Sequence, residues 1–202
     1  MRPMDIERRS MEIIESELQV ELPDDVKPIV KRVIHATADF SFAENLYFAP
    51  GVVDRMRGMM QRGATLVTDT NMALAGINKT AAAHLGLALK CFMAEQDVAG
   101  EAKSRGVTRA EVSMERALAI QGPLILVCGN APTFLFPLVN SARRDDVAAI
   151  GVPVGFVNVC EAKQQLVDSG VPCIAAMGRR GGSNVAAAIV NALMYGIEGA
   201  RA

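Results

Sequence analysis

One of the two histidines in this chain occupies a position suited to acid–base chemistry. In a helix over residues 24–36, at about 100° per residue, five apolar residues share one face, namely Val26, Ile29, Val30, Val33 and Ile34. His35 lies close to the opposite pole of that helix, so it is not part of the expected core. A histidine there is either exposed without a function or faces a second surface, such as a ligand pocket or a subunit contact.

The segment GRRGGS has the composition of an anion-binding loop. Gly181 and Gly182 precede a helix expected to begin near Ser183, so free N–H groups and the positive end of the helix dipole face the same space. Arg179 and Arg180 add two charges suited to a carboxylate or a phosphate. The loop is neither a P-loop nor a G-x-G-x-x-G dinucleotide fingerprint. A solvated arginine pair is the alternative interpretation.

Two further loops place small and polar residues directly after short apolar runs. Thr70 and Asn71 follow ATLVTD, while Gly129, Asn130 and Thr133 follow LILVC. Helix capping is the alternative role for the second group. Loops that follow parallel strands meet at one edge of the sheet, where ligands of such folds bind. Several such loops at one edge favour a common binding cleft.

Arg109 is a candidate ligand-binding residue because of its place in a helix. It sits in the first turn of a helix that Thr108 is expected to cap, where a cation opposes the helix dipole. No G-x-S-x-G nucleophile motif is present. With two histidines and four scattered cysteines, we expect no metal site. The residues alone therefore predict an anion-binding protein and do not name a reaction.

The elements that position these residues alternate between short apolar strands and helices. Five strands are expected, over residues 64–69, 87–93, 124–128, 147–152 and 172–178. Helices are expected between them, including one over residues 131–145. This alternation is typical of a doubly wound, mainly parallel α/β sheet with helices on both faces. We predict a single domain over residues 1–202, in which a helical N-terminal extension, residues 1–62, packs on an α/β core, residues 63–202.

Composition excludes several classes of function. The net charge is −1, which favours neither nucleic acid nor an anionic membrane as a partner. The first ten residues are too charged for a signal peptide, and no apolar run approaches the roughly 18 residues of a membrane span. The cysteines form no C-x-x-C pair, which favours reduced thiols and a cytoplasmic location.

Six segments, in this order along the chain, resemble the precorrin-8X methylmutase family of corrin biosynthesis: RVIHATAD, GATLVTDTNMALAGINK, VTRAEVSME, GNAPTFLF, GVPVGFVNVCEAK and GRRGGSNVAAA. The resemblance implies a flavodoxin-like three-layer fold and a homodimer with the substrate near the subunit contact. It also implies an isomerase that moves a methyl group from C-11 to C-12 of a tetrapyrrole and needs no external cofactor.

The resemblance also assigns roles to individual residues. It implies that His35 is the general acid and that the substrate is bound by Arg9, Ser10, Arg109 and the glycine-rich loop that ends at Ser183. A protonated imidazole near a ring nitrogen would make the adjacent π system electron-poor and favour methyl migration. The segment CFMAEQDVAGEAKSRGVTR resembles the cobalt-handling branch, and the sequence leaves open whether the substrate carries cobalt. A non-catalytic carrier of the corrinoid product is the alternative.

Overall fold

A six-stranded, mostly parallel sheet forms the centre of the protein, whose computed structural model describes residues 3–200. The strand order is β1-β6-β5-β4-β2-β3, and only the β1–β6 pair is antiparallel. The strands are β1 (Leu46–Phe48), β2 (Thr65–Thr68), β3 (Ala88–Lys90), β4 (Leu124–Cys128), β5 (Val147–Gly151) and β6 (Cys173–Ala176). All residues of β4, β5 and β6 are buried, as expected for parallel strands covered on both faces.

The expected count of five strands is wrong by one. The additional strand, β1, has only three residues, all half-buried, and pairs with β6 at the edge of the sheet. Three residues are too few to show a strand period in the sequence. Because β1 lies within residues 1–62, this part of the chain contributes a strand as well as helices.

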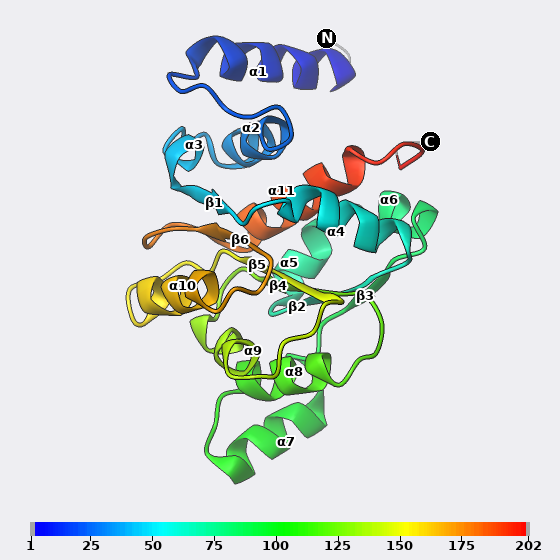
Figure 1. Cartoon of the computed structure of the whole chain (residues 1–202), viewed down its shortest axis with the longest axis vertical. Helices are drawn as coiled ribbons and strands as arrows, with labels where there is room; N and C mark the ends of the chain where they lie inside the picture. The colour runs from blue at the N-terminus through cyan, green and yellow to red at the C-terminus, as the bar shows by residue number, and fades with distance from the viewer. Residues whose placement is uncertain (1–2, 201–202) are drawn as a thin grey trace.

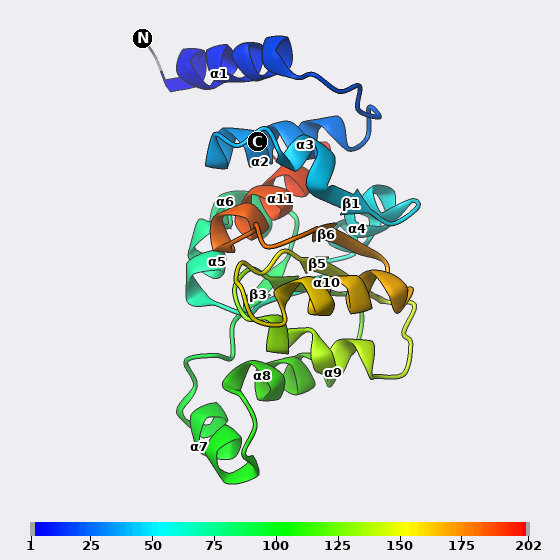
Figure 2. The ribbon, with the colours of Figure 1, turned by 90° about the vertical axis from the view of Figure 1, so that its left-hand side faces the viewer.

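Helices cover both faces of the sheet (Figures 1 and 2). Leu66, Ile125 and Ile150 point toward one core cluster, and Val67, Leu126 and Ala149 point toward the other. The first face is covered by α2 (Lys27–Thr37), α3 (Phe42–Asn45), α4 (Val52–Gln61), α5 (Asn71–Gly76), α6 (Lys79–His84) and α11 (Ser183–Tyr195). The second is covered by α8 (Arg109–Leu118), η1 (Pro132–Phe134), α9 (Phe136–Val139) and α10 (Val159–Asp168).

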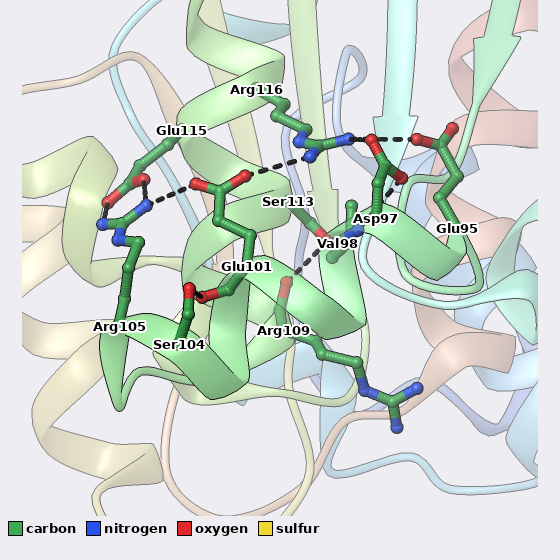
Figure 3. A network of polar contacts seen from close by, with 10 residues as sticks. All are labelled: Glu95, Asp97, Val98, Glu101, Ser104, Arg105, Arg109, Ser113, Glu115 and Arg116. Atoms are coloured by element: carbon green, nitrogen blue, oxygen red, sulfur yellow. Dashed lines mark hydrogen bonds and ion pairs between the residues drawn. The ribbon is translucent and has the colours of Figure 1, made fainter.

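Two helices form outer layers at opposite ends of the long axis (Figure 1). Helix α1 (Pro3–Glu17) packs on α2, with Ile14 buried in the first core cluster. Helix α7 (Gln96–Arg105) packs on α8 through Val98 and Val112. An ion-pair network surrounds this contact, in which Arg116 binds Asp97 and Glu101 (Figure 3).

Helix α2 has the predicted buried face but a different start. Ile29, Val30, Val33 and Ile34 are buried. The helix begins at Lys27 rather than at residue 24, its N-cap is Val26, and no side chain caps it. Pro28 lies in the first turn, where its fixed φ and its lack of an N–H group fit the start of a helix.

The helix expected over residues 131–145 is also wrong. Only η1 and α9 form there, and Pro137 lies in the first turn of α9. Beyond α9, the Arg144 guanidinium donates to the carbonyl oxygens of Leu118 and Ile120, at 2.8 and 2.9 Å. These contacts hold the segment before β5 in a non-helical path.

Candidate functional site

Four loops at the carboxyl ends of β2, β4, β5 and β6 are joined by direct contacts. The Thr70 and Ser183 hydroxyls lie 2.8 Å apart, which joins the β2 loop to the β6 loop. The Gly182 N–H donates to the Val152 carbonyl oxygen at 2.9 Å, which joins the β6 loop to the β5 loop. The loops that follow the parallel strands therefore meet at one edge of the sheet, as predicted, and contacts connect them.

Asp69, at the end of β2, holds the loop that follows β4. Its fully buried carboxylate accepts hydrogen bonds from the N–H groups of Gly129, Asn130 and Ala131, at 2.8, 2.7 and 2.8 Å. Burial raises the pKa of Asp69, and the three N–H groups oppose that rise. Its signal in the sequence was its place after an apolar strand, but no role was predicted for it.

Close backbone packing at Gly129 joins the β4 loop to the start of α11. A Cβ atom at Gly129 would lie 2.8 Å from the Cα atom of Ser183, which is closer than real Cβ contacts. At Gly181 a Cβ atom would overlap the Val152 carbonyl oxygen. Glycine at both positions therefore allows the loops to approach one another, and α11 begins at Ser183 as predicted.

Lys163, on α10, holds the arginine- and glycine-rich loop after β6 by hydrogen bonds to its backbone. Its side chain is fully buried, and Nζ donates to the carbonyl oxygens of Gly178 and Arg180, at 2.9 and 2.8 Å. Burial lowers the pKa of Lys163 to about 8. The sequence carried a signal for this residue, because Lys163 lies on the same helical face as Val159 and Leu166.

Arg180 connects this loop to the end of the helix that carries His35. Its Nη1 lies 2.5 Å from Oδ2 of Asp39 and also contacts the Ser41 hydroxyl. Hydrogen bonds from Ser41 and the charge of Arg180 hold the pKa of Asp39 below its usual value. Ala38, with φ of 53°, turns the chain after α2 so that Asp39 reaches the loop.

His35 itself is exposed in the last turn of α2, four residues before Asp39. It is therefore outside the core, as its position in the sequence predicted. The contact between Asp39 and Arg180 brings the end of its helix to the edge of the sheet that carries the four loops.

The surface of this edge combines positive charge with apolar side chains. Arg179 lies over the ring of Phe156, with Cζ 5.6 Å from the ring centroid. Phe156 is 82% exposed, and Met72, Val154 and Val157 are exposed nearby in the chain after β2 and β5. Exposed apolar side chains beside an arginine fit a flat ligand that carries anionic groups.

Thr133 and Arg109 lie together beside this edge. The Thr108 hydroxyl caps α8 in a capping box with Glu111, as predicted, and lies 3.1 Å from the Thr133 hydroxyl. Arg109 is exposed, and its side chain extends away from the ion pairs of α7 and α8 (Figure 3). Among the described residues, no carboxylate forms an ion pair with Arg109, so its charge is available to a ligand.

The two residues on α1 are not brought to the loops by any described contact. Arg9 pairs with Glu12 at 3.1 Å, and the Ser10 hydroxyl donates to the Ile6 carbonyl oxygen at 2.9 Å. Asn71, the first residue of α5, is exposed after its cap Thr70. The substrate-binding role that the resemblance implies for Arg9 and Ser10 stays a prediction.

A cavity of about 670 Å³ lies between α1, α2 and the end of α11, and none of the candidate residues lines it. We take the sheet edge as the candidate site because the linked loops and the exposed Arg179 lie there. Within residues 3–200, no group of three potential ligands among His, Cys, Asp and Glu is arranged to hold a metal ion. No helix in this part of the chain combines the length and apolar character needed to cross a bilayer.

The fold and these loops define an α/β protein with a mostly parallel sheet, whose loops meet at one edge beside exposed arginines. The family model for precorrin-8X methylmutase matches residues 5–196, so the chain belongs to that family. It is 39% identical over 201 residues to the cobalt-precorrin-8 methylmutase of Salmonella typhimurium, covering 96% of this chain and 95% of the relative. It is 35% identical over 194 residues to the precorrin-8X methylmutase of Pseudomonas aeruginosa, covering 93% of each. The crystal structure of precorrin-8x methyl mutase from Thermus thermophilus superposes with a TM-score of 0.87 at 35% identity, covering 95% of both chains.

Replacing Asp69 with Asn should destabilise the protein. The Asn amide group would present N–H donors to loop N–H groups that now meet a carboxylate oxygen. We expect the free energy of unfolding to fall by about 1–3 kcal/mol, measured by urea denaturation. Asp25→Asn, at an exposed position, is the control. Equal stabilities of Asp69→Asn and the control would contradict the anchoring role.

Replacing Lys163 with Met should remove a pH dependence of stability. Because burial lowers the pKa of Lys163 from 10.5 to about 8, the unfolded chain binds this proton more tightly than the folded one. The contribution of Lys163 to the free energy of unfolding therefore rises as the pH increases from about 8 to 10.5 and is lost as the pH falls through 8. Urea denaturation across this range should show that rise in the wild type and in the control Gln165→Met. The same rise in Lys163→Met would contradict the assignment.

Proposed function

We propose that this protein moves a methyl group from C-11 to C-12 of precorrin-8X or cobalt-precorrin-8, with His35 as the general acid. Membership of a family of isomerases in corrin biosynthesis supports the reaction. The observation that carries the proposal is the contact between Arg180 and Asp39, which joins the His35 helix to the candidate anion-binding loop.

The edge of the sheet suits the chemistry of such a substrate. A tetrapyrrole of this kind carries several carboxylates around a flat apolar macrocycle. The start of α11 and the charges of Arg179 and Arg109 can bind carboxylates. The exposed side chains of Met72 and Phe156 can contact the macrocycle.

The reaction needs a proton donor and a fixed substrate position. The methyl group leaves C-11 and forms a bond to C-12 of the same molecule, so no atom is gained or lost. In its protonated form, His35 would donate to a ring nitrogen and draw electron density from the ring carbons that exchange the methyl group. The carboxylate contacts would hold the macrocycle still while the bond moves.

We further propose that the protein is a homodimer, with the substrate near the contact between the subunits. The exposed Arg9 and His35 and the half-buried Ser10 would then be partly covered by the second copy. An isologous contact is the commonest arrangement for such an assembly. Sedimentation of a fully active protein as a monomer at micromolar concentration would refute this proposal.

Two finer statements complete the proposal. Without β1, the strand order β3-β2-β4-β5-β6 has the pattern of flavodoxin-like doubly wound sheets, and we classify residues 1–202 as one domain of that kind. The four free cysteines support a cytoplasmic location, where thiols stay reduced. Cell fractionation tests the location.

The reaction is tested by incubating the protein with precorrin-8X and with cobalt-precorrin-8. Methyl migration changes the conjugation of the macrocycle, so the absorption spectrum reports turnover for each substrate. The faster reaction identifies the natural substrate. Product binding without turnover of either substrate would instead favour a corrinoid carrier.

Replacing His35 with Asn should remove turnover while leaving the fold intact. The side chain is exposed, so its loss leaves no cavity, but the proton donor is gone. We expect turnover to fall by at least about a hundredfold, measured spectroscopically at saturating substrate. His84→Asn changes the other histidine, which is also exposed, and should retain full activity. Near-normal turnover of His35→Asn would refute the assignment.

The two arginines of the loop should differ in their effects. Arg179 has no carboxylate partner among the described residues, so Arg179→Ala should weaken substrate binding by roughly ten- to a hundredfold. Arg180 is already paired with Asp39, so Arg180→Ala should lower turnover more than affinity. Titration and steady-state kinetics separate these effects. Unchanged affinity for both variants at low salt would mean that the loop does not bind the substrate.

A further inference from the structure

The cavity between α1, α2 and the end of α11 has features of a binding site. Its volume is about 670 Å³, which is large enough for a small organic molecule. Met11, Pro28 and Ala192 provide apolar lining, and Tyr195 provides an aromatic ring. The cavity lies at the C-terminal end of α11, whereas the four loops meet at its N-terminal end, and the two share no residue.

Cations outnumber acids around this cavity. Five basic residues line it, namely Arg8, Lys27, Lys31, Arg32 and Arg57, against three acidic ones. Glu15 accepts ion pairs from both Lys27 and Lys31, so one carboxylate serves two cations. Arg32 pairs with Glu7, and Arg8 pairs with Asp5 and Glu12, which lie outside the lining. Among the described residues, Arg57 is the lining cation that forms no ion pair with a carboxylate.

Arg57, on α4, has a buried side-chain nitrogen, Nε, that lacks a hydrogen-bond partner within the described part of the chain. No carboxylate among residues 3–200 forms an ion pair with its guanidinium group. A buried guanidinium nitrogen without a partner costs free energy, which an anion in the cavity would recover.

Gly196 makes room for the Arg57 side chain. A Cβ atom at Gly196 would lie 2.7 Å from both Cζ and Nε of Arg57. The φ of Gly196 is −81°, a value that any residue adopts, so its conformation does not require glycine. The absence of a side chain at this position therefore serves the placement of the guanidinium group beside the cavity.

We propose that this cavity binds a small organic anion, with Arg57 as the principal contact to its carboxylate or phosphate group. The neighbouring lysines add charge, and Met11 and Tyr195 contact the apolar part of the ligand. The ligand is either a separate metabolite or a carboxylate arm of a tetrapyrrole. The proposal does not depend on the reaction assigned to the sheet edge.

Calorimetric titration with phenyl phosphate, isophthalate and inorganic phosphate tests the site. Phenyl phosphate carries a phosphate group on a benzene ring, isophthalate carries two carboxylates on a benzene ring, and inorganic phosphate has no ring. We expect both ring compounds to bind more tightly than inorganic phosphate, and the tighter of the two identifies the preferred anionic group. No measurable heat with any of the three at millimolar concentration would overturn the proposal.

Three variants separate a specific contact from general charge. Arg57→Gln should weaken binding by at least about tenfold. Gly196→Ala leaves the net charge unchanged but displaces the guanidinium group, so it should also weaken binding. Arg62→Gln removes a cation at the end of the same helix, outside the cavity, and should change nothing. Equal losses in Arg57→Gln and Arg62→Gln, or unchanged binding in Gly196→Ala with a native circular dichroism spectrum, would overturn it.

The source of the anion is identified by competition. If a tetrapyrrole arm occupies the cavity, the product of the methyl shift will displace phenyl phosphate, and Arg57→Gln will weaken product binding. If a separate metabolite is the ligand, phenyl phosphate will bind equally well to the product-saturated protein. Both outcomes support an anion site at Arg57, and His35→Asn should leave phenyl phosphate binding unchanged in either case.

Discussion

The candidate site depends on the hydrogen bonds that the buried carboxylate of Asp69 accepts from the loop after β4. Removing a carboxylate from water is costly, and three backbone N–H groups from a single loop offset that cost here. The bond fixes Gly129, whose backbone in turn packs against Ser183 at the start of α11. One polar contact at the end of β2 thereby sets the position of two loops that lie 60 and more residues away in the sequence.

A second set of contacts extends this order outward, from the sheet to the helix that carries His35. Lys163 fixes the carbonyl oxygens of the loop after β6, and Arg180 of that loop binds Asp39 beyond α2. Both cations bind oxygen atoms of the protein itself, whereas no carboxylate among the described residues pairs with Arg179 or Arg109.

Much of this arrangement could be predicted from the sequence, because it depends on local patterns. The bounds of β4, the start of α11, the Thr108 cap and the buried face of α2 all follow from apolar periodicity and capping residues. The roles of Asp69 and Lys163 were not predicted, because their partners are backbone groups of distant loops. The strand β1 was missed for a related reason, since a three-residue edge strand exists only through its pairing with β6.

The sheet has short strands at both edges, and this has a consequence for the behaviour of the protein at high concentration. Unpaired backbone groups at a sheet edge can recruit a strand from another molecule and so begin aggregation. Here β1 and β3 have three residues each, and β3 ends in the exposed Lys90. A strand from another molecule would find few backbone groups to pair with at either edge and, at β3, the charge of Lys90. The short edge strands thus disfavour fibre-like association, and the longer apolar strands β4 and β5 lie inside the sheet.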